Sequence, residues 1–129
     1  MSYYFAKTLS GKGFDDVVAR VIDALKDEGF GILTEVDVRA TMKKKLDKDF
    51  RPYRILGACN PSLAYQALQA EDKIGTMLPC NVIVQETKNG IEVAAVDPVA
   101  SMQAVENPEL ARVAATVRDK LKQLIEGLL

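Results

Sequence analysis

The chain has 129 residues, a length typical of a single domain that buries its own core. Hydrophobic residues make up 48% and charged residues 27%, and 17 basic side chains almost balance 18 acidic ones. A general nucleic-acid binder would carry a basic excess, so the composition argues against a nucleic-acid partner. The sequence contains no histidine, which excludes Ser-His-Asp and Cys-His nucleophile activation and the usual imidazole zinc sites.

Targeting and cofactor motifs are also missing from the sequence. No apolar run approaches the ~20 residues of a membrane-spanning helix, and residues 1–7 lack the basic-then-apolar order of a signal peptide. We therefore expect a cytoplasmic protein with no membrane partner and with reduced cysteines. There is no phosphate-binding Walker loop and no dinucleotide glycine fingerprint, so no cofactor is expected.

Hydrophobic periodicity divides the chain into strands and helices. Three helix starts are marked by a capping side chain followed by proline, at Asn60-Pro61, Asp97-Pro98 and Asn107-Pro108. In the first half of the chain the pattern predicts a strand over 2–8, a helix over 14–29, a strand over 30–36, a short helix over 37–45, a strand over 50–58 and a helix from 60. After a connection over 71–79, it predicts a strand from 82, a hairpin turn over 87–90 and a strand over 91–96. A short helix from 97 and a long helix from 107 end the chain.

This order, βαβαβαββαα, does not alternate throughout, so a doubly wound parallel sheet is not expected. We predict a single α+β domain over residues 1–129, with a mostly antiparallel twisted sheet of about five strands and helices packed largely on one face. Strict alternation would put Phe30, Ile32, Thr34 and Val36 on one face of their strand. The apolar end of the last helix, Leu128-Leu129, is expected to pack on the sheet or on a second subunit.

The two cysteines each begin a Cys-Asn dipeptide, at Cys59-Asn60 and at Cys80-Asn81. Cys59 directly precedes a helix cap, where unpaired N–H groups and the helix dipole favour negative charge. A thiol in that position can have a lowered pKa and be reactive, and the same helix start could bind an anion. The competing interpretation is that Cys59 is a packing residue, because buried cysteine is common.

Cys80, between Pro79 and a strand, would on its own be read as a core residue. If the third and fourth strands are neighbours, however, the two Cys-Asn corners can meet at one end of the sheet. Two thiols there could bind Cu(I) or another soft ion, or form a redox disulfide. For Asn60 and Asn81 the simpler interpretation is that their amides satisfy backbone groups at a cap and a turn.

Two basic clusters also admit two interpretations. Arg54 lies on the strand that leads to Cys59, with Arg51 and Tyr53 alternating to its other face, and could contact an anion or an aromatic ligand. It could equally form a simple ion pair at an exposed strand. The run Lys43-Lys44-Lys45 is either a solvated helix end or a rim that attracts anions.

Two segments, Pro52-Tyr53-Arg54-Ile55-Leu56-Gly57-Ala58-Cys59-Asn60-Pro61 and Leu78-Pro79-Cys80-Asn81-Val82, resemble the domain-of-unknown-function 302 family. Met42-Lys43-Lys44-Lys45-Leu46 and Asp97-Pro98 also fit the family pattern, and the resemblance covers nearly the whole chain. It implies a prokaryotic protein with a compact α+β sandwich that tends to form homodimers. No activity is established for the family, so the resemblance implies no catalytic residue.

These observations favour a homodimeric, non-catalytic binding module for a small molecule or an anion. Its predicted ligand-binding residues are Cys59, Asn60, Cys80, Asn81 and Arg54. One alternative is a cytoplasmic thiol redox or soft-metal protein that uses Cys59 and Cys80. Another is a structural or partner-binding dimer whose interface is the last helix.

Overall fold

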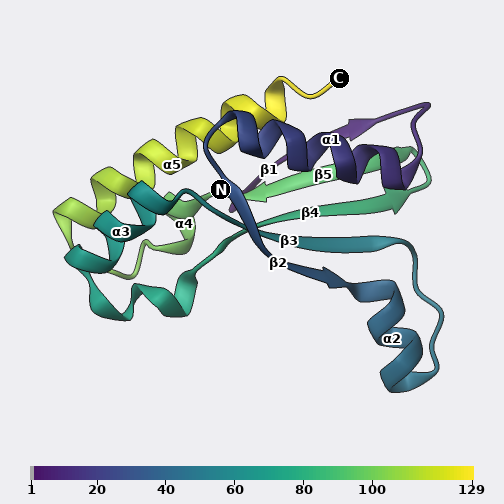
Figure 1. Ribbon diagram of the computed structural model, residues 1–129, viewed down its shortest axis with the longest axis horizontal. Helices are drawn as coiled ribbons and strands as arrows, with labels where there is room; N and C mark the ends of the chain where they lie inside the picture. Colours follow the sequence, from purple (N-terminus) through teal and green to yellow (C-terminus); the bar gives the residue numbers. More distant parts are fainter. Residues whose placement is uncertain (1) are drawn as a thin grey trace.

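The computed structural model describes residues 2–129 and contains an antiparallel five-stranded sheet with the strand order β1-β5-β4-β3-β2 (Figure 1). The α+β architecture and the element order are as predicted. The elements are β1 (Tyr4–Leu9), α1 (Phe14–Asp27), β2 (Gly31–Asp37), α2 (Val38–Leu46), β3 (Tyr53–Cys59), α3 (Pro61–Ala70), the 3₁₀ helix η1 (Asp72–Met77), β4 (Cys80–Thr87), β5 (Gly90–Val96), α4 (Pro98–Ser101) and α5 (Pro108–Glu126).

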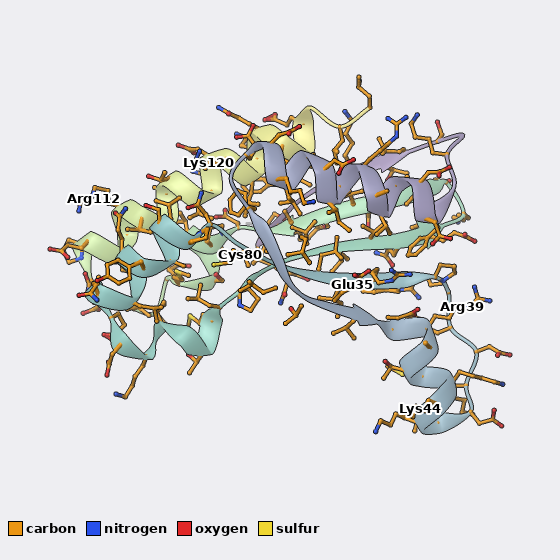
Figure 2. The ribbon with its side chains drawn as sticks, viewed as in Figure 1. Glu35, Arg39, Lys44, Cys80, Arg112 and Lys120 are labelled. Atoms are coloured by element: carbon orange, nitrogen blue, oxygen red, sulfur yellow. The ribbon has the colours of Figure 1, made fainter. Side chains whose placement is uncertain are left out.

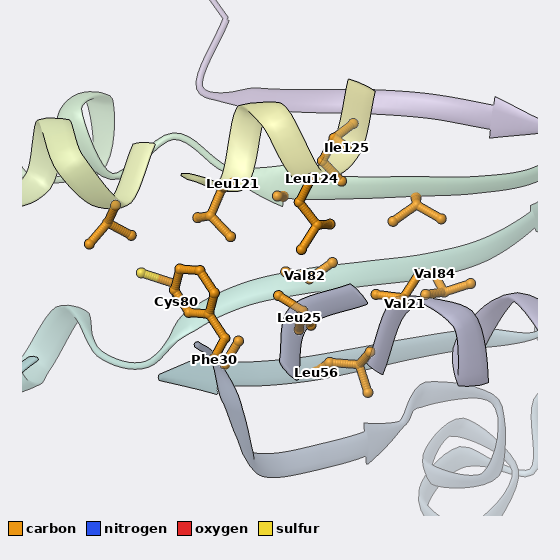
Figure 3. Close-up of a cluster of buried hydrophobic side chains, with 14 of the residues drawn as sticks. Val21, Leu25, Phe30, Leu56, Cys80, Val82, Val84, Leu121, Leu124 and Ile125 are labelled. Atoms are coloured by element: carbon orange, nitrogen blue, oxygen red, sulfur yellow. The ribbon is translucent and has the colours of Figure 1, made fainter. Parts of the chain in front are cut away.

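The core lies between one face of the sheet and the helices α1 and α5. Each of these helices turns an apolar stripe inward, and the stripes meet the alternate residues of β3, β4 and β5. Figure 3 shows Leu121, Leu124 and Ile125 of α5 above Val82 and Val84 of β4. No buried residue in the described part of the chain is polar or charged. The burial of these stripes is therefore what holds the helices on the sheet.

The opposite face of the sheet, which we call the open face, carries none of this packing. Its side chains are assigned by register, because residues that are paired across antiparallel strands point to the same side. We use this name for the three central rows of that side, without the strand ends, and they consist of Tyr4, Ala6, Thr8, Thr34, Val36, Tyr53, Ile55, Gly57, Asn81, Ile83, Gln85, Glu92, Ala94 and Val96.

Three capping side chains set the helix starts at the end of the sheet where α3 and α4 lie. The Asn60 side chain accepts a hydrogen bond from the Leu63 amide at 3.2 Å, and Asn107 and Asp97 cap α5 and α4 in the same way. Proline follows each cap, as predicted. The connection over 71–79 is more ordered than expected, because it contains η1 with a fully buried Ile74.

One strand departs from the predicted alternation. A register shift between Ile32 and Thr34 puts Ile32 opposite Ala58, toward the core, and Thr34 opposite Gly57, on the open face. Ile32, Thr34 and Val36 therefore do not share one face. The inserted residue, Leu33, is 66% exposed, which is typical of a β-bulge.

The ends of α5 and α2 differ in how they use their apolar residues. Leu128 is buried in the core, whereas Leu129 is 81% exposed, so the end of α5 packs on its own sheet. Asp37 caps α2 through the Ala40 amide at 2.9 Å, but no residue of α2 is buried, and Leu46 is 62% exposed. Figure 1 shows α2 projecting from the body of the protein.

Candidate functional site

The two cysteines meet at one end of the sheet because β3 and β4 are neighbours. Ala58 pairs with Cys80, so Cys59 and Pro79 come next in the register, where β3 ends and β4 begins. Both cysteines line one cavity beneath α3, α4 and α5. We call this region the cysteine corner, defined by Cys59, Asn60, Pro79 and Cys80. The condition under which the two Cys-Asn corners can meet, that the third and fourth strands are neighbours, is fulfilled.

The cavity at the cysteine corner is small and apolar. Its volume is about 30 Å³, enough for a water-sized group but far below the few hundred cubic ångströms of a metabolite site. Aliphatic and aromatic side chains supply nearly all of the wall. Besides the cysteine corner, it is lined by Phe30, Ala58, Leu63, Ala64, Ala67, Leu78, Pro98, Met102, Leu110, Val113, Ala114 and Val117.

Both thiols are held in the neutral form. Burial, with a smaller contribution from the nearby Cys59, raises the pKa of Cys80 to about 11. Burial also raises the pKa of Cys59. The helix start was expected to lower the pKa of Cys59, but the Asn60 side chain and Pro61 already occupy that end of α3, and the surrounding wall is apolar. The thiolate, which is the nucleophilic form, is therefore scarce at neutral pH.

The two asparagines of the Cys-Asn pairs have different environments. Asn60 caps α3, and a Cβ atom built on Gly29 would lie 3.1 Å from its side-chain nitrogen, so Asn60 is closely packed. Asn81 pairs with Gly57 on the open face, on the other side of the sheet from the cavity. It is exposed and lines a hollow there. The structure therefore unites three of the predicted site residues and separates Asn81 from them.

Arg54 lies five residues before Cys59, which is about 16 Å along a strand. Its guanidinium is 2.6 Å from the Glu35 carboxylate and 3.9 Å from that of Asp37, and it stacks over Phe14 at 5.7 Å. A hollow of about 530 Å³ beside it is also lined by Asp15 and Asp16 at the start of α1. Because these carboxylates surround it, Arg54 is engaged in ion pairs, and an anion gains little there.

Few side chains could bind a metal. No cluster of three or more His, Cys, Asp or Glu side chains suited to a metal ion occurs within residues 2–129. The two thiols of the cysteine corner remain as a pair of soft ligands. Figure 2 shows Cys80 at the junction of the sheet with the α3 end, far from Arg39 and Lys44 on the α2 arm. The region of the chain described here also has no helix that is long and apolar enough to cross a membrane.

The fold and the cysteine corner define a small α+β protein with a twin cysteine motif. The family model of the domain of unknown function DUF302 matches residues 5–128, and the chain belongs to that family. It is similar to the crystal structure of an uncharacterised conserved DUF302 protein from Bacillus stearothermophilus, with 26% sequence identity, 98% of each chain covered and a TM-score of 0.90. A search of the curated proteins finds no match.

Proposed function

We propose that the protein is a non-catalytic binding module that works as a homodimer and takes its ligand at the cysteine corner. One observation carries the proposal: two segments about twenty residues apart in the sequence bring both cysteines to the wall of one cavity. The half-buried Cys59 forms the accessible side and Cys80 the buried side. The size and lining of the cavity favour a ligand that inserts one small apolar group, rather than an anion.

A cavity-filling variant tests this proposal. Ala67 of α3 is 3% exposed and lines the cavity, so Ala67→Leu should fill it. We expect a metabolite that bears a small apolar group to raise the melting temperature of the wild-type protein and not that of Ala67→Leu. Ala115→Leu, at an exposed position of α5, is the matched control and should respond like the wild type. A ligand shift that survives in Ala67→Leu would place binding elsewhere, and a panel of such metabolites that shifts nothing would contradict the proposal.

The paired thiols also support a second function, the binding of one soft ion such as Cu(I). A single ion fits a cavity of about 30 Å³, and Cu(I) prefers thiolate ligands. The raised pKa values do not prevent this, because a metal displaces the thiol protons when it binds. They do argue against thiol redox chemistry near neutral pH, which needs a free thiolate.

Competition with a coloured Cu(I) chelator would test this second function. The wild-type protein should withdraw one equivalent of Cu(I) per chain, and Cys59→Ser and Cys80→Ser should each lose most of that affinity. Asn81→Ala is the control, since Asn81 adjoins Cys80 in sequence but faces the other side of the sheet. Undiminished binding in either serine variant would exclude a site that uses both thiols.

A further inference from the structure

The open face is organised in three rows that run across the strands. The central row is apolar on all five strands: it consists of Ala6, Ala94, Ile83, Ile55 and Val36. The row on one side contains Thr8, Glu92, Gln85 and Tyr53. The row on the other side contains Tyr4, Val96, Asn81, Gly57 and Thr34.

Charge is almost absent from this surface. Glu92 is the one charged side chain among the fourteen residues of the open face, in a chain whose charged fraction is 27%. Its carboxylate accepts a hydrogen bond from the Gln85 amide at 2.8 Å, and Gln85 accepts one from Arg51 at 2.8 Å. The apolar side chains nevertheless meet solvent: Tyr4 is 44% and Val36 is 42% exposed. A continuous apolar surface of this kind marks an interaction site.

From this arrangement we infer that the open face is the surface on which a second copy of this chain docks, sheet against sheet. The inference rests on the homodimer in the proposed function and identifies its interface. It also replaces the last helix as the candidate interface, because Leu124, Ile125 and Leu128 are already buried in their own core.

A second copy suits this face because the face is self-complementary. A two-fold axis that lies in the interface, either along the strands or across them, sets the central apolar row of one copy on that of the other. The charged groups at this surface are the carboxylate of Glu92 and the guanidinium of Arg51, which both bond to Gln85, so the surface has no excess of either sign for an oppositely charged partner to match. The two inner faces would then interdigitate about 10 Å apart, as in a β-sandwich.

The extent of the face fits a stable dimer. Five strands ~4.8 Å apart and three rows ~7 Å apart give a flat area of about 500 Å² per copy, or about 1,000 Å² for both copies together. The uneven surface of the side chains adds to this area. That total reaches the lower limit for a specific interface. A hollow of about 450 Å³ on the face, lined among others by Tyr3 and Tyr4, offers space in which side chains of the other copy can insert.

Sedimentation analysis of the intact chain tests the inference. The wild-type protein should sediment at twice its chain mass of 14.1 kDa at micromolar concentration. Ile83→Lys, at the centre of the apolar row, should sediment as a monomer with an unchanged circular dichroism spectrum. Val36→Lys, at the exposed end of the row, should weaken dimerisation at least tenfold and serves if Ile83→Lys fails to fold. Leu68→Lys, at a 43% exposed position of α3, is the matched control and should remain a dimer.

Each outcome separates the interface from the ligand site. A monomeric wild-type protein would overturn both the interface and the homodimer. A dimer that persists in folded Ile83→Lys and Val36→Lys would overturn the interface alone and leave the homodimer standing. The cavity lies on the other side of the sheet, so the response of monomeric Ile83→Lys to a cavity ligand should equal that of the wild type. A dimer that dissociates only in Leu68→Lys would place the interface on α3.

Discussion

The two faces of the central strands have similar composition and different surroundings. Toward α1 and α5, Leu56, Val82 and Val93 are fully buried. On the opposite side of the same strands lie Ile55 and Ile83, which are only half-buried in the single chain. A sheet with one solvated face normally alternates apolar and polar residues. These strands are apolar on both sides, which is typical of a sheet with both faces covered. The helices of one chain, however, cover only one of the two faces.

The largest expected effect comes from truncating adjacent residues of β3 that face opposite sides. Leu56→Ala should lower the free energy of unfolding by about 2–5 kcal/mol, because it leaves a cavity in a closed core. Ile55→Ala should lower it by about 1 kcal/mol in dilute protein, and by more as protein concentration rises and the proposed dimer forms. Urea unfolding at several protein concentrations measures both variants. Equal losses at every concentration would mean that the two faces are equivalent.

The crowding around Gly57 on the open face provides a second test. A Cβ atom at this position would lie 2.7 Å from Cγ of Pro79 and would also meet the side chain of Thr34. Gly57→Ala should therefore destabilise the protein by about 1–3 kcal/mol in urea unfolding. Gly31→Ala is the control, because a Cβ atom there has no neighbour within 4 Å and should cost little. A stable Gly57→Ala protein would show that Thr34 and Pro79 move easily.

The cysteine corner should respond to alkaline pH. Because burial raises the pKa of Cys80 to about 11, the folded protein keeps the thiol proton at a pH where the unfolded chain loses it. The proton held by Cys80 therefore contributes fully to the free energy of unfolding below the ordinary thiol pKa. This contribution falls as pH rises toward 11, and the loss reaches about 2 kcal/mol near pH ~10.5. Thermal melts should show a shallower alkaline decline for Cys80→Ala than for the wild-type protein. Parallel declines would mean that Cys80 ionises freely in the folded state.

The smallest effect concerns a polar side chain on the core side of β1. The Lys7 ammonium donates hydrogen bonds to the carbonyl oxygens of Leu128 and, at 3.0 Å, of Glu126, at the end of α5. Lys7→Met should keep the packing and lose the favourable charge at the helix end, which costs about 0.3–1 kcal/mol in urea unfolding. Lys88→Met, at an exposed position of the turn before Gly90, should change nothing measurable. A Lys7→Met protein as stable as the wild type would remove Lys7 from the contacts that hold α5.

Local patterns predicted most of the fold, because they depend on neighbours in the sequence. The caps at Asn60, Asp97 and Asn107 and the turn before Gly90 are encoded by the residues that form them. The bulge after Ile32 could not be predicted, because a register shift depends on which residues of β3 the strand meets. The order of the helix η1 depends on the burial of Ile74, which is likewise a tertiary contact.

The sequence predicted which cysteines come together at the candidate site better than it predicted the cavity and the pKa values there. Cys59 and Cys80 meet because the strands that carry them pair, which was the stated condition for the corner. Strand alternation alone places Asn81 opposite to Cys80, so that separation could have been predicted. The volume of the cavity and the raised pKa of Cys59 could not, since both depend on the distant α5 and α4 that close the wall.

The α2 arm, residues Val38–Leu46, does not pack into the core. None of its side chains is buried, and the ion pairs of Lys43 with Asp47 and Asp49 lie in solvent. Such a segment opens at a free energy far below that of global unfolding. Its amide protons should therefore exchange with deuterium long before those of β4 and β5. It is also where a protease would first cut the native protein, and where an inserted peptide would disturb the remaining structure least.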